Sequence, residues 1–274
     1  MNNFLSRSIT GAIIVAVMIA AIAINEYTFF AVFLAILIGG LNEFYTIFQQ
    51  SGKHPQKNTG LALGAIVFTL MFLAAKGFDV GLIPQFNQII VILAVVSIVI
   101  YEMYRKKSNP FENIALTLLG VAYIALPISL LWMISFRENL YIYNPHLILG
   151  YFIIVWTYDS MAYVSGMMFG KRKLFERISP KKSWEGAIGG FIFSIAIAIG
   201  ISYFFIELTA LKWAIFAALV AILGTYGDLA ESLLKRSNDI KDSGTILPGH
   251  GGILDRFDAL FLAIPVVYLY LQFV

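Results

Sequence analysis

Nine long apolar stretches dominate this sequence and leave little choice of fold. They fall at residues 9–25, 27–48, 59–76, 82–104, 111–135, 145–168, 186–206, 209–234 and 257–274. A helix needs about 20 apolar residues to cross a bilayer, and most of these stretches reach that length. None shows the alternating pattern of barrel strands, which leaves helices to satisfy the backbone polar groups within lipid. We therefore predict an all-α polytopic integral membrane protein with about nine transmembrane helices.

The composition excludes the common water-soluble classes of protein. Hydrophobic residues make up 59% of the 274 residues and charged residues only 13%, whereas soluble domains contain about 25% charged residues. A water-soluble enzyme and a nucleic-acid-binding protein are both excluded, and the lipid bilayer is the expected environment. Because the chain has no cysteine, disulfides and thiolate metal sites are impossible.

The positions of lysine and arginine orient the helices. Cytoplasmic connections of membrane proteins carry an excess of both residues. Of the 19 basic residues, 16 fall at the N-terminus and in the second, fourth, sixth and eighth connections, and the others are Lys76, Arg137 and Lys212. This split predicts a cell (inner) membrane protein with a cytoplasmic N-terminus and an external C-terminus. The first stretch also resembles a cleavable signal peptide, and its removal would leave eight spans in the same orientation.

The chain shows no low-complexity linker and no internal repeat, so we predict one membrane-embedded domain over residues 1–274. Residues 1–150 supply apolar helices, and residues 151–274 form the catalytic half. Two cytoplasmic loops, 169–185 and 236–256, hold most of the polar residues in that half.

The eighth connection begins with a polar helix face. Asp228, Glu231, Ser232, Lys235 and Arg236 stand at offsets of 0, 3, 4, 7 and 8, which places them on one side of a helix. One interpretation is an amphipathic helix end that leaves the membrane, with Glu231 paired to Lys235. The other is a functional site, because a carboxylate so near the apolar stretch is costly and usually functional.

A glycine-rich segment and two further acids follow. Glycines at 249, 251 and 252, before a helix start, allow backbone N–H groups to approach an anion, which indicates a phosphate cradle. Asp255 and Asp258 lie three residues apart, and helix capping explains one of them better than both. Together with Asp228 they suit a divalent cation that holds phosphates, since Mg²⁺ prefers oxygen ligands. Zinc is a poor candidate because the three histidines, His54, His146 and His250, are scattered.

The sixth connection follows Asp159, which lies several residues inside the predicted membrane limit. A buried carboxylate satisfied by neighbouring hydroxyls competes here with a polar cavity for substrate or ion. Six basic residues between 171 and 182 set the topology, contact anionic lipid, or bind substrate. Glu43, in the second apolar stretch, is interpreted as a structural polar contact.

The two polar connections carry a specific resemblance. The segment from Ser232 to Asp258 closely resembles the signature of the phosphatidate cytidylyltransferase (CDP-diacylglycerol synthase) family. The matching residues are Ser232, Lys235, Arg236, Lys241, Asp242, Gly244, Leu247, Pro248, His250, Gly251, Gly252, Asp255, Arg256 and Asp258. The segment from Asp159 to Gly186 resembles the family's second block, with Ser183 in place of the usual threonine. The first 150 residues resemble the family only in being apolar.

This resemblance implies transfer of a cytidylyl group from CTP to phosphatidate in phospholipid biosynthesis. It implies Mg²⁺, or another divalent cation such as Mn²⁺, with a second cation and a homodimer left open. Implied catalytic residues are Asp228, Lys235, Arg236, Lys241, Asp255, Arg256 and Asp258, with Asp228, Asp255 and Asp258 as metal ligands. Implied substrate-binding residues are Asp159, Lys171, Lys173, Ser179, Lys181, Lys182, Ser183, Ser232, Asp242, Gly249, His250, Gly251 and Gly252.

Two other functions are consistent with parts of the sequence. A CTP-dependent lipid kinase would use similar helices but would attack the γ-phosphorus with an alcohol, which requires a base. A cation or solute transporter would explain the intramembrane Asp159 and Asp228. It would not explain the long cytoplasmic block of Gly, Asp and Arg residues.

Overall fold

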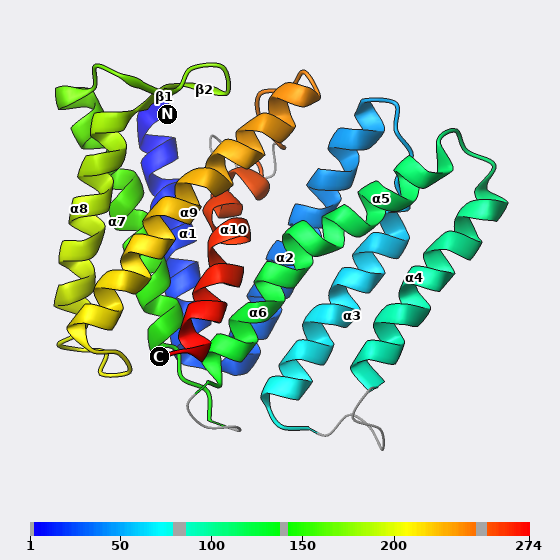
Figure 1. The fold of residues 1–274 in the computed structure, drawn as a ribbon, viewed down its shortest axis with the longest axis horizontal. Coiled ribbons are helices and arrows are strands. Elements are labelled where there is room, and N and C mark those ends of the chain that lie inside the picture. Colours follow the sequence, from blue (N-terminus) through cyan, green and yellow to red (C-terminus); the bar gives the residue numbers. More distant parts are fainter. Residues whose placement is uncertain (1–2, 79–85, 138–141, 245–250) are drawn as a thin grey trace. The chain divides into compact units, whose positions relative to one another are not determined.

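The computed structural model describes residues 3–78, 86–137, 142–244 and 251–274. The helices are α1 (Asn3–Ile24), α2 (Glu26–Gln50), α3 (Lys57–Ala75), α4 (Phe86–Arg105), α5 (Pro110–Gly120), the π-helix η1 (Val121–Ala125), α6 (Leu126–Ser135), α7 (His146–Phe169), α8 (Trp184–Ile201), α9 (Ala210–Ser237) and α10 (Leu254–Gln272) (Figure 1). Two short strands, β1 (Lys173–Phe175) and β2 (Ser179–Ser183), form an antiparallel hairpin.

The all-α polytopic character predicted from the sequence is confirmed. Every predicted apolar stretch overlaps a helix in the part of the chain that the structure describes. Six helices there are long and apolar enough to cross a membrane: Glu26–Gln50, Lys57–Ala75, Pro110–Ser135, His146–Phe169, Trp184–Ile201 and Ala210–Ser237. The number of nine spans and the orientation of the termini stay predictions.

The span Pro110–Ser135 is one helical run with a local change of winding. Pro127 stands near the start of α6 and has no N–H to donate to the preceding turn. The turn before it, η1, winds as a π-helix, a form that appears mostly as single turns inside α-helices. The missing donor explains why the wider turn lies at this place.

The chain divides into two compact units. The first contains Met1–Tyr143 and Asp242–Asp255, and the second contains Asn144–Lys241 and Arg256–Val274. Helix α10 therefore begins with two residues of the first unit and continues in the second. The prediction of a single membrane-embedded domain stays a prediction.

An aromatic cluster forms the centre of the first unit. Trp132 of α6 is fully buried, and its ring centroid lies 4.7 Å from that of Phe29, 4.6 Å from Phe72 and 5.5 Å from Phe68. These tilted and edge-on contacts are the arrangements that aromatic rings prefer. The cluster holds α2, α3 and α6 together.

A second buried group in this unit is polar. Glu102 of α4 is 3% exposed and accepts hydrogen bonds from Gln56 Nε2 at 2.8 Å, Asn113 Nδ2 at 2.8 Å and Arg105 Nη1 at 2.7 Å. A buried carboxylate needs such partners to offset its lost hydration. This network fastens α4 to the start of α3 and to α5.

The second unit is built on α7, α8 and α9, which pack in that order. Ser183 caps α8 by accepting a hydrogen bond from the Gly186 N–H at 3.2 Å, and Thr209 caps α9 in the same way through the Lys212 N–H at 3.4 Å. The hairpin lies at the end of the unit where α7 finishes and α8 begins (Figure 1).

The hairpin occupies the predicted loop 169–185 and was not expected from the sequence. Lys173 pairs with Ser183 and Phe175 with Ser179, with an irregular register between the two pairs. The strands are three and five residues long, and most of their residues are polar or charged. No alternating apolar pattern marks such strands in advance.

Candidate active site

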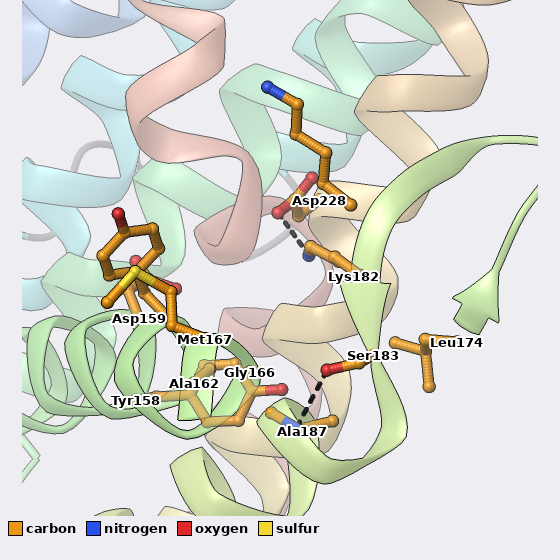
Figure 2. A pocket seen from close by; sticks show the side chains of 13 residues that line it. Tyr158, Asp159, Ala162, Gly166, Met167, Leu174, Lys182, Ser183, Ala187 and Asp228 are labelled. Atoms are coloured by element: carbon orange, nitrogen blue, oxygen red, sulfur yellow. Dashed lines mark hydrogen bonds and ion pairs between the residues drawn. The ribbon is translucent and has the colours of Figure 1, made fainter. Parts of the chain in front are cut away.

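An ion pair between Lys182 and Asp228 connects the hairpin to α9. The Lys182 ammonium meets Oδ2 of Asp228, as Figure 2 shows. The two side chains are 28% and 34% exposed, and ion pairs that are open to solvent contribute about 0–1 kcal/mol to stability. Stability alone therefore gives little reason for this pair. Both residues belong to the substrate and metal sets predicted from the sequence.

Three carboxylates of the second unit come together near this ion pair. Helix α10 crosses α9 at Gly227, where a Cβ would lie 2.4 Å from the Asp258 carbonyl oxygen. This close crossing brings Asp228, the next residue of α9, near Asp258. Asp258 is close enough to Asp228 and to Asp159 of α7 for their charges to interact. Carboxylates gathered in this way repel one another, so the cluster favours the binding of a cation.

Positive charges on the hairpin and on α10 also act on the cluster. The charges of Lys182 and Arg256 both act on Asp159. The arrangement therefore combines oxygen ligands for a cation with cationic groups that can neutralise phosphate.

The polar face predicted on α9 is partly paired within the helix. Ser232 Oγ donates to Asp228 Oδ1 at 3.3 Å, and Lys235 Nζ lies 2.6 Å from Oε2 of the buried Glu231. The guanidinium of Arg236 donates to a backbone carbonyl just beyond the helix, at 3.0 Å. Ser232 thus contacts the carboxylate cluster directly, whereas Lys235 and Arg236 have local partners in the part of the chain that the structure describes.

A polar cavity of about 380 Å³ opens beside these residues. Its charged and hydroxylic lining comes from α7, the hairpin and α9, and includes Asp159, Lys181, Lys182, Ser183 and Asp228. Figure 2 shows Ser183 at the start of α8, close to the backbone that it caps. The volume lies within the range of small-molecule sites.

An apolar cavity of about 430 Å³ adjoins the polar one. The two cavities share Tyr158, Leu174 and Ala187 in their linings. The rest of the apolar lining comes from β1, α8 and α9: Phe175, Trp184, Ile188, Phe191, Ala221, Ile222, Thr225, Tyr226 and Leu229. The pair of cavities matches an amphiphilic ligand, with charge at one end and hydrocarbon at the other.

Asp255 belongs to the first unit. Its Oδ2 accepts hydrogen bonds from the Ser243 N–H at 3.0 Å, the Ser243 hydroxyl at 2.9 Å and the Gly252 N–H at 2.8 Å. Gly251 has φ of +80°, a backbone conformation that glycine adopts readily and other residues rarely adopt. The Asp255 side chain therefore stabilises the glycine-rich turn before α10, and both interpretations of this residue, helix capping and metal ligation, stay predictions.

The remaining predicted site residues lie in several places. Lys171, Lys173 and Lys181 are exposed on or beside the hairpin, and Ser179 is half-buried there. Lys241 and Asp242 are exposed after α9, and Gly252 is buried. Gly249 and His250 lie outside the described residues.

No group of three or more His, Asp or Glu side chains within the described residues is positioned to hold a metal ion as it stands. The donor chemistry nevertheless fits a hard divalent cation. Asp159, Asp228 and Asp258 are carboxylates near one another, and Mg²⁺ commonly uses one or two carboxylates together with substrate phosphates and water. Metal ligation by these residues stays a prediction.

One contact of the site was not predicted from the sequence, and for Glu43 of the first unit only a structural polar contact was predicted, without its partners. Tyr158 of α7 and Thr225 of α9 share a hydroxyl–hydroxyl hydrogen bond at the boundary of the two cavities. Glu43 of α2 contacts the turn before α10. Neither residue lies in the two polar connections, and their partners are 67 and more than 200 positions away.

Comparison with known proteins places these features in a family. The chain matches the sequence model of the cytidylyltransferase family over residues 5–274. It is 34% identical over 217 residues to the phosphatidate cytidylyltransferase of Haemophilus influenzae, covering 74% of this chain and 75% of that protein. It is 39% identical over 169 residues to that of Staphylococcus haemolyticus, covering 61% and 62%. The match to the family model spans nearly the whole chain, and we conclude that the protein belongs to the cytidylyltransferase family.

Proposed function

We propose that this protein transfers CMP from CTP to phosphatidate, forming CDP-diacylglycerol and pyrophosphate. The observation that carries the proposal is the polar cavity with Lys181, Lys182 and Asp228, which adjoins an apolar cavity. A lipid phosphate is the kind of molecule that both cavities together can hold. The relatives named phosphatidate cytidylyltransferase support the same reaction.

The chemistry asks little covalent participation from the protein. A phosphate monoester is largely ionised near neutral pH, with a second pKa of about 6. One of its oxygens can bond to the α-phosphorus of CTP while the bond from that phosphorus to the bridging oxygen breaks. Pyrophosphate then leaves with the electron pair. The protein must bring two polyanions together and stabilise the charge that develops on the leaving group.

The cationic and the anionic residues of the site would have different roles in this reaction. Lys181 and Lys182 line the polar cavity, and Arg256 acts electrostatically on its wall at Asp159. We assign these cations to the phosphates of the two substrates. Asp228 and Asp258 would hold the divalent cation, Mg²⁺ or Mn²⁺, which supplies Lewis-acid stabilisation of the phosphates when bound. The prediction that Asp255 is a further ligand is kept.

The apolar cavity would receive part of one acyl chain. Phe175, Trp184 and Ile188 line it and stay 43% to 54% exposed. These side chains rise from the hairpin and from α8, directly beside the polar cavity. A lipid whose phosphate meets Lys182 would place its glycerol near Tyr158 and a chain beyond it.

We further propose that the enzyme spans the membrane nine times, with the N-terminus and the site in the cytoplasm. CTP is available on that side, and the lipid head group lies at the same interface. The excess of basic residues in alternate connections supports this orientation.

Identification of the product tests the proposal. Purified protein would be incubated with α-labelled CTP, phosphatidate and Mg²⁺. We expect the label in CDP-diacylglycerol. A lipid kinase would instead release labelled CDP, and a transporter would leave CTP unchanged.

A further inference from the structure

Glu43 is a buried carboxylate of α2 that lies outside both polar connections. It is 4% exposed. Its Oε1 accepts a hydrogen bond from the Ile253 N–H at 2.9 Å, and its Oε2 accepts one from the Leu254 N–H at 2.9 Å. Oε2 also accepts a hydrogen bond from the Ser243 hydroxyl at 3.0 Å. Both oxygens are therefore used, and all the donors belong to the segment that leads into α10.

The backbone of that segment is shaped around this carboxylate. A Cβ at Gly244 would lie 2.6 Å from Oε1 of Glu43, and a Cβ at Gly252 would lie 2.4 Å from Oε2. Any side chain at either position would displace the carboxylate or the turn. The absence of side chains at Gly244 and Gly252 thus leaves space for the carboxylate of Glu43.

The location suits a negative charge for a physical reason. The first N–H groups of a helix have no partner within the helix, and the helix dipole adds positive potential there. Glu43 supplies acceptors to two of these groups at the start of α10. A capping residue normally stands next to the helix in the sequence. Glu43 lies 210 positions before Ile253, from whose N–H it accepts a hydrogen bond.

Ser243 connects Glu43 to Asp255. The Ser243 hydroxyl lies 3.0 Å from Oε2 of Glu43 and 2.9 Å from Oδ2 of Asp255. A hydroxyl has a single proton to donate, so the two carboxylates share it. The same Oδ2 of Asp255 is held by the N–H groups of Ser243 and Gly252. Movement of Glu43 would therefore shift the groups that orient Asp255.

We propose that Glu43 is a positioning residue for Asp255, acting through Ser243 and through the backbone of Ile253 and Leu254. The role rests on the proposed function, in which Asp255 serves the metal-dependent transfer. Glu43 fixes the rotamer of that carboxylate from the membrane helix α2. The structural polar contact predicted for Glu43 agrees with these hydrogen bonds, and the proposal adds a role at Asp255.

Glu43→Gln is the informative substitution, because it keeps the size of the side chain but replaces one acceptor oxygen with a donor. Either the Ile253 N–H, or the Leu254 N–H and the Ser243 hydroxyl, then faces a donor. Glu102→Gln is the matched control. Glu102 is equally buried in the same unit, and its partners Gln56, Arg105 and Asn113 do not belong to the segment 243–255.

Hydrogen exchange gives a readout that does not depend on turnover. In Glu43→Gln, the amides of residues 251–255 should exchange faster than in wild type, while the rest of α10 is unchanged. The control variant should leave these amides as they are. Equal exchange in wild type and Glu43→Gln would overturn the proposal at its first step.

Kinetics then test whether positioning matters for the reaction. We expect the Mg²⁺ concentration for half-maximal activity of Glu43→Gln to rise about tenfold, a size typical for residues that orient metal ligands. The KM for CTP at saturating Mg²⁺ should change little. Ser243→Ala should shift the Mg²⁺ requirement in the same direction, and the double variant should be no worse than the worse single variant.

Two outcomes separate this proposal from the proposed function. If wild type makes no CDP-diacylglycerol, the proposed function fails, whatever the exchange data show. If wild type is active and Glu43→Gln has the Mg²⁺ requirement of wild type, the positioning role of Glu43 is refuted.

Discussion

Lys182 is the residue whose charge acts most directly on the carboxylates of the site. Its ammonium pairs with Asp228, and its charge acts on Asp159. Lys182→Met removes this cation from the polar cavity. We expect kcat/KM to fall by about 100-fold or more, the usual loss for a group that stabilises developing charge. Lys182→Arg should recover part of the activity.

Lys53→Met serves as the control in the same assay. The Lys53–Glu112 pair has an N–O distance of 2.6 Å, and its side chains are 37% and 38% exposed, so it resembles the Lys182–Asp228 pair in exposure. It belongs to the first unit and lines neither cavity. Equal activity of the two Met variants would show that Lys182 has only a surface role.

Substitution of Asp255 and Asp258 by asparagine distinguishes metal ligation from helix capping. Asn keeps the size of Asp and an acceptor oxygen, but loses the negative charge. Asp255→Asn and Asp258→Asn should each reduce kcat by at least about 100-fold at ordinary Mg²⁺ concentrations, because electrostatic stabilisation is usually the largest catalytic contribution. Membrane insertion and thermal stability in detergent should remain close to wild type. Activity within a few-fold of wild type would leave capping as the sole role.

The sequence predicted which side chains share a helix face better than it predicted contacts between distant residues. The offsets on α9 correctly placed Asp228 four residues from Ser232, and these side chains touch. Helical spacing is a local property, so it can be read from the chain. The contact of Glu43 with Ser243 spans 200 positions and depends on how α2 packs, which no local pattern encodes.

At the scale of elements, the hairpin and α8 form the wall where a lipid chain would lie. Ile188 lines the apolar cavity and is 54% exposed, so a larger side chain there fills the cavity without disturbing the core. Ile188→Trp should lower kcat/KM for long-chain phosphatidate about tenfold relative to a dioctanoyl substrate, within the range for hydrophobic pockets.

Ile197→Trp provides the comparison on the same helix. Ile197 is also exposed, at 37%, and does not line either cavity. This variant should keep the chain-length preference of wild type. An unchanged preference in Ile188→Trp, alongside an active wild type, would exclude the acyl chain from this cavity.

The connection between α8 and α9 carries a pH-dependent contact. Burial opposes ionisation of Glu207, but hydrogen bonds from Asn144, from its own backbone and from His146 outweigh this effect and lower its pKa. A lowered folded-state pKa stabilises the protein above the unfolded pKa of about 4.3, and this stabilisation is lost as the pH falls through the folded value. At pH 7 the melting temperature of wild type should therefore be higher than that of Glu207→Gln. This difference in melting temperature should disappear in acid. A difference in melting temperature that persists at a pH below the folded-state pKa of Glu207 would contradict the stabilising role of this carboxylate.

The elements themselves were largely predictable, because long apolar runs have few alternatives in a membrane. The last apolar stretch begins at residue 257, but the glycines before Asp255 indicated a helix start at Asp255, and α10 begins one residue earlier, at Leu254. The N–H of Leu254, the first residue of this helix, and that of Ile253 before it find acceptors in Glu43, and the Gly252 N–H finds one in Asp255.

At the scale of the whole molecule, the predicted topology is open to direct labelling. The wild type has no cysteine, so single cysteines can be introduced without background. Ser179→Cys, on the hairpin, should resist an impermeant thiol reagent on intact cells. Phe273→Cys, at the 87% exposed C-terminal position, should react. Labelling of Ser179→Cys in intact cells would contradict the cytoplasmic location of the site.

The two compact units do not follow the order of the chain. The sequence predicted one domain, with apolar helices over residues 1–150 and a catalytic half over 151–274, and the first unit includes Met1–Tyr143. However, residues 242–255 of the predicted catalytic half cluster with that unit. Glu43 and Ser243 provide the physical reason, since their contact attaches this segment to α2. Composition identifies apolar helices but not which of them receives a later loop.

The central claim is that the lipid phosphate attacks the α-phosphorus of CTP directly, with both substrates in one site. The stereochemical course at that phosphorus tests this most directly, with CTP made chiral at the α-position and phosphatidate as acceptor. A single displacement predicts inversion, and no exchange of labelled pyrophosphate into CTP in the absence of lipid. Net retention, or a CMP adduct trapped on Ser232 or His250, would contradict the claim and make that residue a nucleophile.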